Sequence, residues 1–355
     1  MNTAANEAKT AGASGFGLKP GQAQPGIRQD RHVLQWHITH KCNLRCAHCY
    51  QDEYQAEMSR DELFAVLDKY DRFLKSKGLQ GHINLTGGEP VAHPDFFPLA
   101  EEIRHRGISF AVLTNGTLLD EDSALRLAEL RPLFVQISMD GGPNVHDKIR
   151  GENAMAGALR AIDYLKAFGV RVLVSFTAQR ANRFQLDNVA RICKVHNVDK
   201  LWWDRVIIPK EEDKEHQMLT GLQFRVLARK AGWYAHRNTL ADGEHYVHCV
   251  RGLQFLYADG VRPYTCAAGH NLLVMKADGD LMPCRRLPYV IGNIRDGELA
   301  DIIDGSDLMK ELREAPIPEA CAGCKHAESC RGGSKCVTCA KTGTWRGKDP
   351  DCRMK

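Results

Sequence analysis

The sequence lacks the hydrophobic segments that would insert it into a membrane or export it. No apolar run reaches the ~18 residues that a membrane-spanning helix needs. The N-terminal stretch MNTAANEAKTAGASGFG contains no apolar core of the kind found in secretory signals. We therefore expect a cytoplasmic protein without a membrane partner. In that reducing compartment, clustered cysteines more often bind metals than form disulfides.

The sequence also lacks clusters of like charge and several common catalytic motifs. The net charge is +4 with a pI near 8.4, and Lys and Arg are scattered without a polybasic run or an aromatic stripe. Nucleic-acid binding is therefore not expected. No HxxxH, HExxH, P-loop, GxSxG or dinucleotide-binding pattern occurs in a suitable context. The sequence thus gives no support for a mononuclear zinc enzyme or for those nucleotide and hydrolase sites.

What the sequence does contain is cysteine. The chain has 355 residues, of which 43% are hydrophobic, enough for one large domain and a smaller one. It has 13 cysteines, an odd number, and most of them lie in CxxC-like clusters. This usage predicts metal sites rather than a disulfide framework.

From about residue 33, apolar strand-like segments alternate with amphipathic helical ones. A capping-box pattern at Ser59 and Glu62 introduces the first helix, and Gly78 can end it. Strands are expected at 32–39, 83–86, 108–114, 133–138, 170–177 and 200–208, with helices behind Ser59, near 94, and at 122–130, 155–168, 186–196 and 219–235. Such alternation is typical of a parallel sheet covered by helices, either doubly wound or a partial barrel. In both folds the chemistry lies at the carboxyl ends of the strands.

Both ends of the chain differ from this pattern. Residues 1–30, rich in Ala, Gly, Gln and Pro, are expected to form a disordered tail. After about residue 245 helical periodicity fades, and nine of the thirteen cysteines fall between Cys249 and Cys352. A hairpin is expected at 272–283, around the turn sequence ADGD. Because this segment has few regular elements, metal coordination would have to supply part of its stability.

The stretch CNLRCAHCY carries three closely spaced cysteines, Cys42, Cys46 and Cys49, at the end of the first strand. Three thiolates on a short loop can hold three irons of a [4Fe–4S] cluster and leave the fourth iron open. A structural zinc site or a buried-thiol loop is the alternative, although structural zinc normally has four protein ligands.

Glycines and polar residues follow the next strands. They are Gly87, Gly88 and Glu89 in TGGEP, Asn115 in LTNG, Ser138 and Asp140 in SMDG, and Arg150 in HDKIRG. Glycines let the backbone approach a ligand, a carboxylate accepts from an ammonium, and arginine offers a bidentate fork to a carboxylate. Singly these residues also fit turns, caps or surface ion pairs. Jointly they predict one ligand site at the strand ends.

With these motifs, residues 33 to about 240 resemble the partial (β/α)6 barrel of radical S-adenosylmethionine (SAM) enzymes. The resemblance implies that Cys42, Cys46 and Cys49 bind the [4Fe–4S] cluster and that its open iron takes the amino and carboxylate groups of SAM. It assigns Gly87, Gly88 and Glu89 to the methionyl amino group, Ser138 and Arg150 to the SAM carboxylate, and Asn115 and Asp140 to the ribose. His48 stands where the family often has Tyr or Phe, which leaves the adenine contact open.

The resemblance also implies a reaction. In radical SAM enzymes the reduced cluster cleaves SAM to methionine and a 5′-deoxyadenosyl radical, which abstracts hydrogen from an unactivated carbon. The protein positions the substrate and excludes competing donors. The sequence identifies neither a general base nor an acceptor of the substrate radical.

The later cysteines resemble the SPASM extension, which carries two auxiliary [4Fe–4S] clusters in peptide- and protein-modifying radical SAM enzymes. By that resemblance one cluster is bound by Cys321, Cys324, Cys330 and Cys352, and the other by Cys266, Cys284 and either Cys336 or Cys339. Five residues separate Cys330 from Cys336 where the family usually has three, and we favour Cys336. The fourth ligand of the auxiliary cluster at Cys266 and Cys284 is left open. Cys339 or Cys249 could supply it, or a substrate thiolate could bind there. One or two zinc knots are the alternative, and Cys193 is expected to be a buried hydrophobe.

The domain organisation and function follow from these resemblances. We expect a tail at 1–30, a radical SAM partial barrel at 31–245 and a loop-rich SPASM domain at 246–355. The leading hypothesis is an oxidoreductase that modifies a peptide or protein side chain by crosslinking, epimerisation or oxidation. The expected partners are that substrate, an electron donor such as flavodoxin or ferredoxin, and a separate leader-binding protein. Alternatives are a SPASM enzyme for a tetrapyrrole-type substrate, a sulfatase-maturing enzyme, or a non-catalytic iron–sulfur electron carrier.

Overall fold

The computed structural model describes residues 28–50, 56–208, 215–237, 246–258 and 261–354. In these ranges ten strands form one sheet in the order β10-β9-β8-β1-β2-β3-β4-β5-β6-β7. A disordered tail was predicted for residues 1–30, and residues 1–27 of that range lie outside the described residues. No helix in the described ranges has both the length and the apolar character needed to cross a bilayer.

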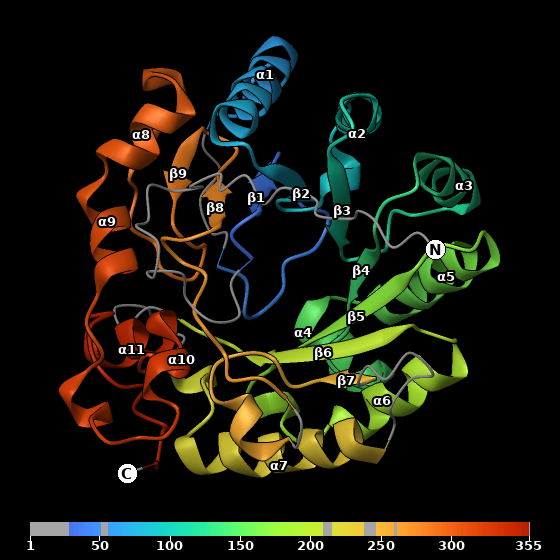
Figure 1. Cartoon of the computed structure of the whole chain (residues 1–355). Coiled ribbons are helices and arrows are strands. Elements are labelled where there is room, and N and C mark those ends of the chain that lie inside the picture. Colours follow the sequence, from blue (N-terminus) through green and yellow to red (C-terminus); the bar gives the residue numbers. More distant parts are fainter. Residues whose placement is uncertain (1–27, 51–55, 209–214, 238–245, 259–260, 355) are drawn as a thin grey trace, which may run out of the picture.

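Six parallel strands form the central part of this sheet. They are β1 (Arg31–His37), β2 (Gln80–Thr86), β3 (Ser109–Thr114), β4 (Val135–Ser138), β5 (Val172–Ala178) and β6 (Lys200–Arg205). Each pairs in parallel with the next along the chain. Because the order is sequential, every right-handed crossover places its helix on the same side of the sheet. The strands curve into an arc with helices outside it, so the fold is the predicted partial barrel and not a doubly wound sheet (Figure 1).

Six long helices cover the outside of the arc. They are α1 (Arg60–Lys77), α2 (Phe96–His105), α3 (Glu121–Leu130), α5 (Ala154–Ala167), α6 (Leu186–Val195) and α7 (Gly221–Arg237). The capping box predicted before the first of them is present, with Ser59 and Glu62 bonded reciprocally, and Gly78 ends that helix with φ 64°. The buried positions of α1 recur at the predicted helical spacing and include Leu63, Leu67 and Leu74.

Helix α4 (Pro143–Arg150) was not among the predicted helices. It is short, and Pro143 occupies its first turn, where the missing N–H leaves no hydrogen bond unmade. Its buried side carries His146, Ile149 and Arg150. The motif HDKIRG is therefore helical, and the helix fixes the direction in which Arg150 points.

The C-terminal segment adds strands to both edges of the barrel sheet. β7 (Val247–His248) pairs in parallel with β6, and β8 (Leu272–Met275) pairs in parallel with β1. β9 (Asp280–Met282) and β10 (Gly292–Asn293) continue antiparallel from β8. The predicted hairpin at 272–283 is thus confirmed, with Gly279 at φ 91° in its turn. One continuous sheet crosses the expected domain boundary at residue 245, and that boundary stays a prediction.

The same segment contains more regular structure than its sequence indicates. Its helices are α8 (Leu299–Gly305), α9 (Asp307–Glu314), α10 (Ala327–Cys330) and α11 (Lys335–Thr342). It also contains the 3₁₀ helices η5 (Gln254–Tyr257), η6 (Ile294–Asp296) and η7 (Glu319–Cys321), whereas η2 (Pro90–Ala92), η3 (Arg180–Asn182) and η4 (Glu215–Gln217) lie in the barrel. These helices span at most eight residues, too few for a clear periodic signal.

Two apolar clusters stabilise the molecule. The larger runs through the barrel and continues into the hairpin at Leu273, Met275 and Leu281. The smaller contains Leu287, Leu312, Val337 and Trp345, and several cysteines pack in it or against it. The second cluster is small, as expected for a segment in which metal coordination supplies part of the stability.

Candidate functional site

A cavity of about 1100 Å³ lies at the carboxyl ends of the parallel strands. The cavity is bordered by eight of the residues predicted to bind the catalytic cluster or SAM: Cys42, Cys46, Cys49, Gly87, Gly88, Asn115, Ser138 and Arg150. The other two, Glu89 and Asp140, are fully buried beside it. The structure therefore brings these residues together at the position that a parallel α/β fold predicts for its site.

The cysteine loop after β1 is held by contacts from several strands away. The Asn115 Nδ2 lies 3.8 Å from the Cys42 Sγ, and the Arg150 Nη1 lies 3.9 Å from the Cys46 Sγ. The Ala47 N–H donates to the Ile149 carbonyl at 2.8 Å, which ties the loop to α4. Burial raises the pKa of the Cys46 thiol to about 11, so this sulfur must lose a proton to bind iron.

Neither a disulfide nor a single-ion site occurs among the described cysteines. Among the described residues, no three His, Cys, Asp or Glu side chains are arranged to hold one metal ion. The described cysteines are all free thiols. In a four-iron cluster each cysteine binds a different iron, so its ligands stand farther apart than those of one zinc ion. Binding of a [4Fe–4S] cluster by Cys42, Cys46 and Cys49 stays a prediction.

The two glycines of TGGEP pack against the chain that leads into the cysteine loop. The Gly88 N–H donates to the Thr39 carbonyl at 2.8 Å. A Cβ atom on Gly88 would stand 2.1 Å from the Lys41 carbonyl oxygen, and one on Gly87 would stand 2.4 Å from that of Thr39. Glycine is therefore needed here for backbone packing, whatever ligand also approaches.

Glu89 is buried and joins two strand ends. Its carboxylate accepts from the Thr114 hydroxyl at 2.5 Å and from the Asn115 N–H at 2.8 Å. The Val91 N–H adds a longer bond of 3.3 Å. Burial raises the pKa of Glu89 to about 7, and these three donors oppose the shift. A carboxylate offers about four acceptor positions, so one remains for an ammonium group.

Asp140 and Arg150 form a buried ion pair. The Arg150 Nε donates to the Asp140 Oδ2 at 2.7 Å, and the Thr177 N–H donates to the other oxygen at 3.0 Å. The His48 Nε2 lies 3.7 Å from the same Oδ2. Although burial raises the pKa of Asp140, Arg150 and His48 hold it below its usual value. The link from the cysteine loop through His48 to Asp140 was missed from the sequence.

Four of the later cysteines surround one small cavity. Cys321, Cys324, Cys330 and Cys352 border it, with Phe255 and His326 among their neighbours. These are the four that the SPASM resemblance groups together. Cys352 follows the others by more than twenty positions in the sequence, so only the fold brings it to them.

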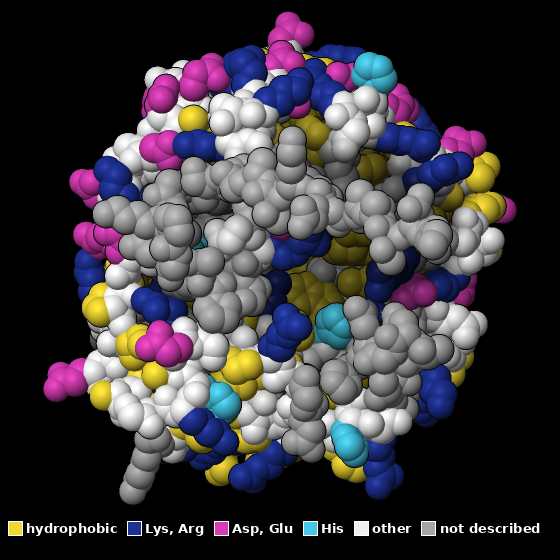
Figure 2. Space-filling model, in the orientation of Figure 1, with side chains coloured by type: hydrophobic (Ala, Val, Ile, Leu, Met, Phe, Trp, Pro, Cys, Tyr) yellow, Lys and Arg dark blue, Asp and Glu magenta, His cyan; other side chains and the backbone are white. Residues whose placement is uncertain are grey.

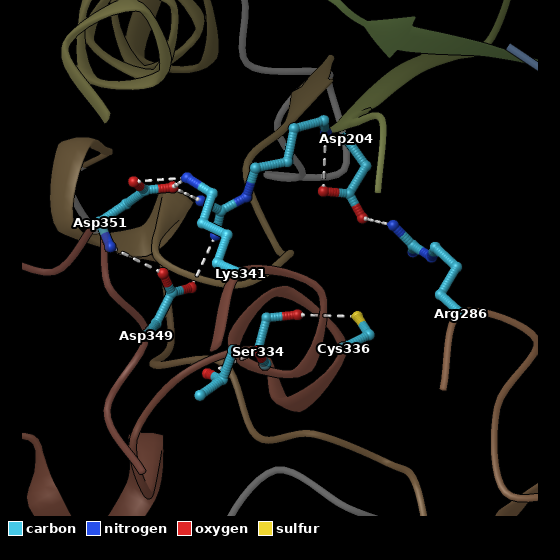
Figure 3. Close-up of polar contacts among 9 residues, drawn as sticks. Asp204, Arg286, Ser334, Cys336, Lys341, Asp349 and Asp351 are labelled. Carbon is cyan, nitrogen blue, oxygen red and sulfur yellow. Dashed lines mark hydrogen bonds and ion pairs between the residues drawn. The ribbon is translucent and has the colours of Figure 1, made fainter. Parts of the chain in front are cut away.

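A second group contains Cys266, Cys284 and Cys336. Each of Cys266 and Cys284 raises the pKa of the Cys336 thiol, which burial brings to about 12. The Cys336 Sγ lies 3.2 Å from the Ser334 Oγ (Figure 3). Cys339 instead contacts the Tyr289 hydroxyl at 3.3 Å. Cys336 therefore lies near Cys266 and Cys284, and its role as the third ligand of this group stays a prediction.

Two further cysteines lie in the main apolar core. Cys193 is fully buried, as predicted, and Cys249 is 1% exposed beside Trp203. Cys249 also borders the large cavity.

A dipeptide at the end of β6 connects the barrel to the cysteine-rich segment. Asp204 accepts from the Arg286 Nη1 at 2.6 Å, and the Arg205 Nη2 donates to Asp349 at 2.7 Å (Figure 3). Arg286 directly follows the Cys284–Arg285 pair of residues, so this contact holds the second cysteine group against the barrel. Opposite charges at the end of an otherwise apolar strand were the available sequence signal. Of the neighbouring tryptophans, Trp203 is core and Trp202 faces the cavity.

Two family models match the chain. The model described as "Radical SAM superfamily" matches residues 36–178, and the model described as "Iron-sulfur cluster-binding domain", SPASM, matches residues 266–325. The chain thus contains a radical SAM domain and a SPASM domain. The cofactors predicted from its sequence, SAM with a [4Fe–4S] cluster and auxiliary [4Fe–4S] clusters, are those of these two domains.

Similar proteins cover nearly the whole of this radical SAM/SPASM chain. Mycofactocin maturase MftC of Mycobacterium tuberculosis (strain CDC 1551 / Oshkosh) is 28% identical, with 90% of this chain and 82% of the relative covered. Fe-coproporphyrin III synthase of Methanosarcina barkeri is 28% identical, with coverage of 92% and 89%. Pre-heme d1 synthase of Dinoroseobacter shibae is 27% identical, with coverage of 91% and 86%.

Solved structures share the fold of this radical SAM/SPASM enzyme. The structure titled "Native anSMEcpe with bound AdoMet" matches with a TM-score of 0.73 and 20% identity, covering 90% of this chain and 94% of anSMEcpe. SuiB of Streptococcus suis bound to S-adenosylmethionine matches with a TM-score of 0.72 and 15% identity, covering 91% of this chain and 77% of SuiB.

Proposed function

We propose that this radical SAM/SPASM enzyme abstracts a hydrogen atom from a peptide or protein side chain as the first step of a covalent modification. When bound, the reduced cluster and SAM supply a 5′-deoxyadenosyl radical. One observation carries the proposal. The cysteine loop, the strand-end motifs and a wall containing Cys249 and Cys284 border the same cavity of about 1100 Å³.

The proposed roles of the strand-end residues follow their positions. Cys42, Cys46 and Cys49 hold the catalytic cluster, and Gly87, Gly88 and Glu89 receive the SAM amino group. Arg150 and Ser138 receive its carboxylate, with the Arg150 fork oriented by Asp140. Asn115 has an amide on the cavity wall for a ribose hydroxyl, whereas Asp140 reaches the ribose only if its pair with Arg150 rearranges.

The substrate class has two candidates. Similarity to a mycofactocin maturase supports a peptide. A separate leader-binding protein, a flavodoxin- or ferredoxin-type electron donor and a cytoplasmic location belong to the same proposal. Similarity to Fe-coproporphyrin III synthase and pre-heme d1 synthase supports a tetrapyrrole-type substrate as the second candidate. The auxiliary clusters would accept an electron from the substrate radical or bind the substrate.

Anaerobic reconstitution with iron and sulfide counts, followed by an assay for 5′-deoxyadenosine with dithionite, tests the proposal. We expect about twelve irons per chain, and about four would remove the auxiliary clusters. The triple variant Cys42→Ala, Cys46→Ala, Cys49→Ala should lose SAM cleavage and keep the auxiliary iron. Cys193→Ala is the matched control and should keep all iron, because Cys193 lies in the apolar core. Deoxyadenosine from the triple variant would refute the cluster assignment.

Mass spectrometry of the two candidate substrates decides between them. A short peptide encoded beside the enzyme and a porphyrin substrate are each incubated anaerobically with enzyme and SAM. A mass change in the peptide supports the peptide hypothesis, and a change in the porphyrin supports the second candidate. Active SAM cleavage with an unchanged peptide mass contradicts the peptide hypothesis.

A further inference from the structure

The charged side chains that line the large cavity are mostly positive. Its described lining contains seven arginines and three histidines but no lysine, and Asp204 is the single Asp or Glu among the described lining residues. Figure 2 shows Lys and Arg side chains around the hollow on this face. A cavity lined by one sign of charge attracts a substrate of the opposite sign.

Three of these arginines already have carboxylate partners. Arg150 pairs with Asp140, Arg205 with Asp349 and Asp351, and Arg286 with Asp204. Their charges are therefore balanced by the protein itself. They contribute little net attraction for a substrate.

Arg251, Arg262 and Arg285 differ, because none of them has a carboxylate oxygen within ion-pair distance in the described part of the chain. Although burial raises the pKa of Asp204, Arg251 is near enough to help Arg286 lower the pKa of that carboxylate. All three lie in the C-terminal segment and border the large cavity. Arg262 is exposed. The Arg285 Nε is buried without a hydrogen-bond partner among the described residues. An unpaired buried donor is costly, and a ligand that accepts from it removes that cost.

Two of the three guanidinium groups are held by aromatic rings. The Arg251 guanidinium lies 4.7 Å from the centroid of Trp202, and that of Arg285 lies 4.4 Å from the centroid of Tyr50. The Arg285 Nη2 also donates to the Tyr50 carbonyl at 3.2 Å. An arginine stacked by its face keeps its remaining N–H donors in the plane of the group. Those donors suit the two oxygens of a carboxylate.

We propose that this wall binds the carboxylate groups of the substrate through Arg251, Arg262 and Arg285. The inference deepens the proposed function and rests on it, since it names the chemistry by which the same cavity selects its substrate. Carboxylates occur both in acidic peptides and on the rim of tetrapyrroles. The competing explanation is that these arginines only offset the charge of a cluster, because burial raises the pKa of the Cys284 thiol and Arg286 and Arg251 oppose that shift.

Anaerobic equilibrium dialysis of the reconstituted enzyme tests the proposal without relying on turnover. The first probe is coproporphyrin III, compared with the same ring after conversion of its carboxylates to neutral amides. The second is an acidic peptide with a free carboxyl terminus, compared with its fully amidated form. We expect at least one acid to bind at least about tenfold more tightly than its neutral form, with weaker binding in high salt. The acid that binds identifies the source of the carboxylates.

The matched variants are Arg251→Gln, Arg262→Gln and Arg285→Gln, with Arg160→Gln as a control that removes one exposed charge from α5. Each cavity variant should weaken binding of the acid by about tenfold, and the control should not change it. Three results would each overturn the inference. The neutral forms could bind as tightly as the acids, neither acid could bind, or the cavity variants could bind the acid as tightly as the control does. The comparison of acid with amide uses the unaltered enzyme, so a variant that loses iron cannot obscure the result. Loss of SAM cleavage with charge-dependent binding retained would contradict the proposed function alone.

Discussion

The Arg205 Nη2 donates to the Asp349 Oδ2 at 2.7 Å across 144 residues of sequence. The two side chains are 4% and 0% exposed. Arg205 also pairs with Asp351, whose carboxylate accepts from the Lys341 Nζ at 2.7 Å (Figure 3). Because Cys352 follows Asp351 directly, this buried cluster of charges fixes the last cysteine relative to the barrel.

Replacing Arg205 with Met should therefore destabilise the protein strongly. The variant leaves two buried carboxylates without their main cation, which costs about 3–5 kcal/mol of the free energy of unfolding. Anaerobic urea unfolding measures this loss, and iron counts should fall because Cys352 is no longer held in place. Arg346→Met is the matched control, since its pair with Glu311 is 63% and 50% exposed. That control should change stability by less than about 1 kcal/mol, and equal losses in both variants would contradict the role of the buried cluster.

Glu89 should make stability depend on pH. Burial raises its pKa from a usual value near 4.5 to about 7, so the folded state binds more protons than the unfolded state between these values. The free energy of unfolding contributed by this group is then largest below that window and falls as the pH rises through it. Urea unfolding of the wild type and of Glu89→Gln from about pH 5 to about pH 8 measures the effect. We expect the wild type to lose stability relative to the variant as pH rises, and parallel pH profiles would refute the shift.

Cys336, which contacts Ser334, should contribute more to iron binding than Cys339, which contacts Tyr289. Cys336→Ser should lose about four irons per chain, because Cys336 groups with Cys266 and Cys284. Cys339→Ser should keep most of its iron, since the Cys339 thiol contacts the Tyr289 hydroxyl. Iron and sulfide counts after identical reconstitution decide between them. Loss of iron in Cys339→Ser with retention in Cys336→Ser would reverse the assignment.

Gly88→Ala should disturb the cysteine loop. The added Cβ would stand 2.1 Å from the Lys41 carbonyl oxygen, so the backbone before Cys42 must move. Overpacking of this kind typically costs about 1–3 kcal/mol, and we expect weaker SAM binding as well. Gly305→Ala is the control, because no atom lies within 4 Å of its added Cβ. Thermal unfolding and SAM dialysis should separate the two variants, and similar behaviour would show that the close packing at Gly88 is unimportant.

Local patterns predicted much of the barrel. The capping box at Ser59, the strand ends before Gly87 and Asn115, and the hairpin around Gly279 all depend on neighbouring residues, and the structure contains each of them. Short helices such as α4 and α9 were missed, because eight residues or fewer give little periodic signal. The pairing of β8 with β1 was also missed, since parallel pairing between distant segments leaves no local pattern.

The sequence by itself determined the type of chemistry. The spacing of Cys42, Cys46 and Cys49 predicts a cluster loop, because residues close in the chain stay close in the fold. Together with TGGEP, this loop resembles those of radical SAM enzymes. Tertiary structure alone decided which distant groups meet. It paired Asp140 with Arg150, brought Cys352 to the other three cysteines of its cavity, and left Arg251 and Arg285 on the cavity wall without a carboxylate oxygen within ion-pair distance among the described residues. The physical reason is that burial, and with it the energy of a charge or a thiol, depends on which segments pack together and not on their order in the chain.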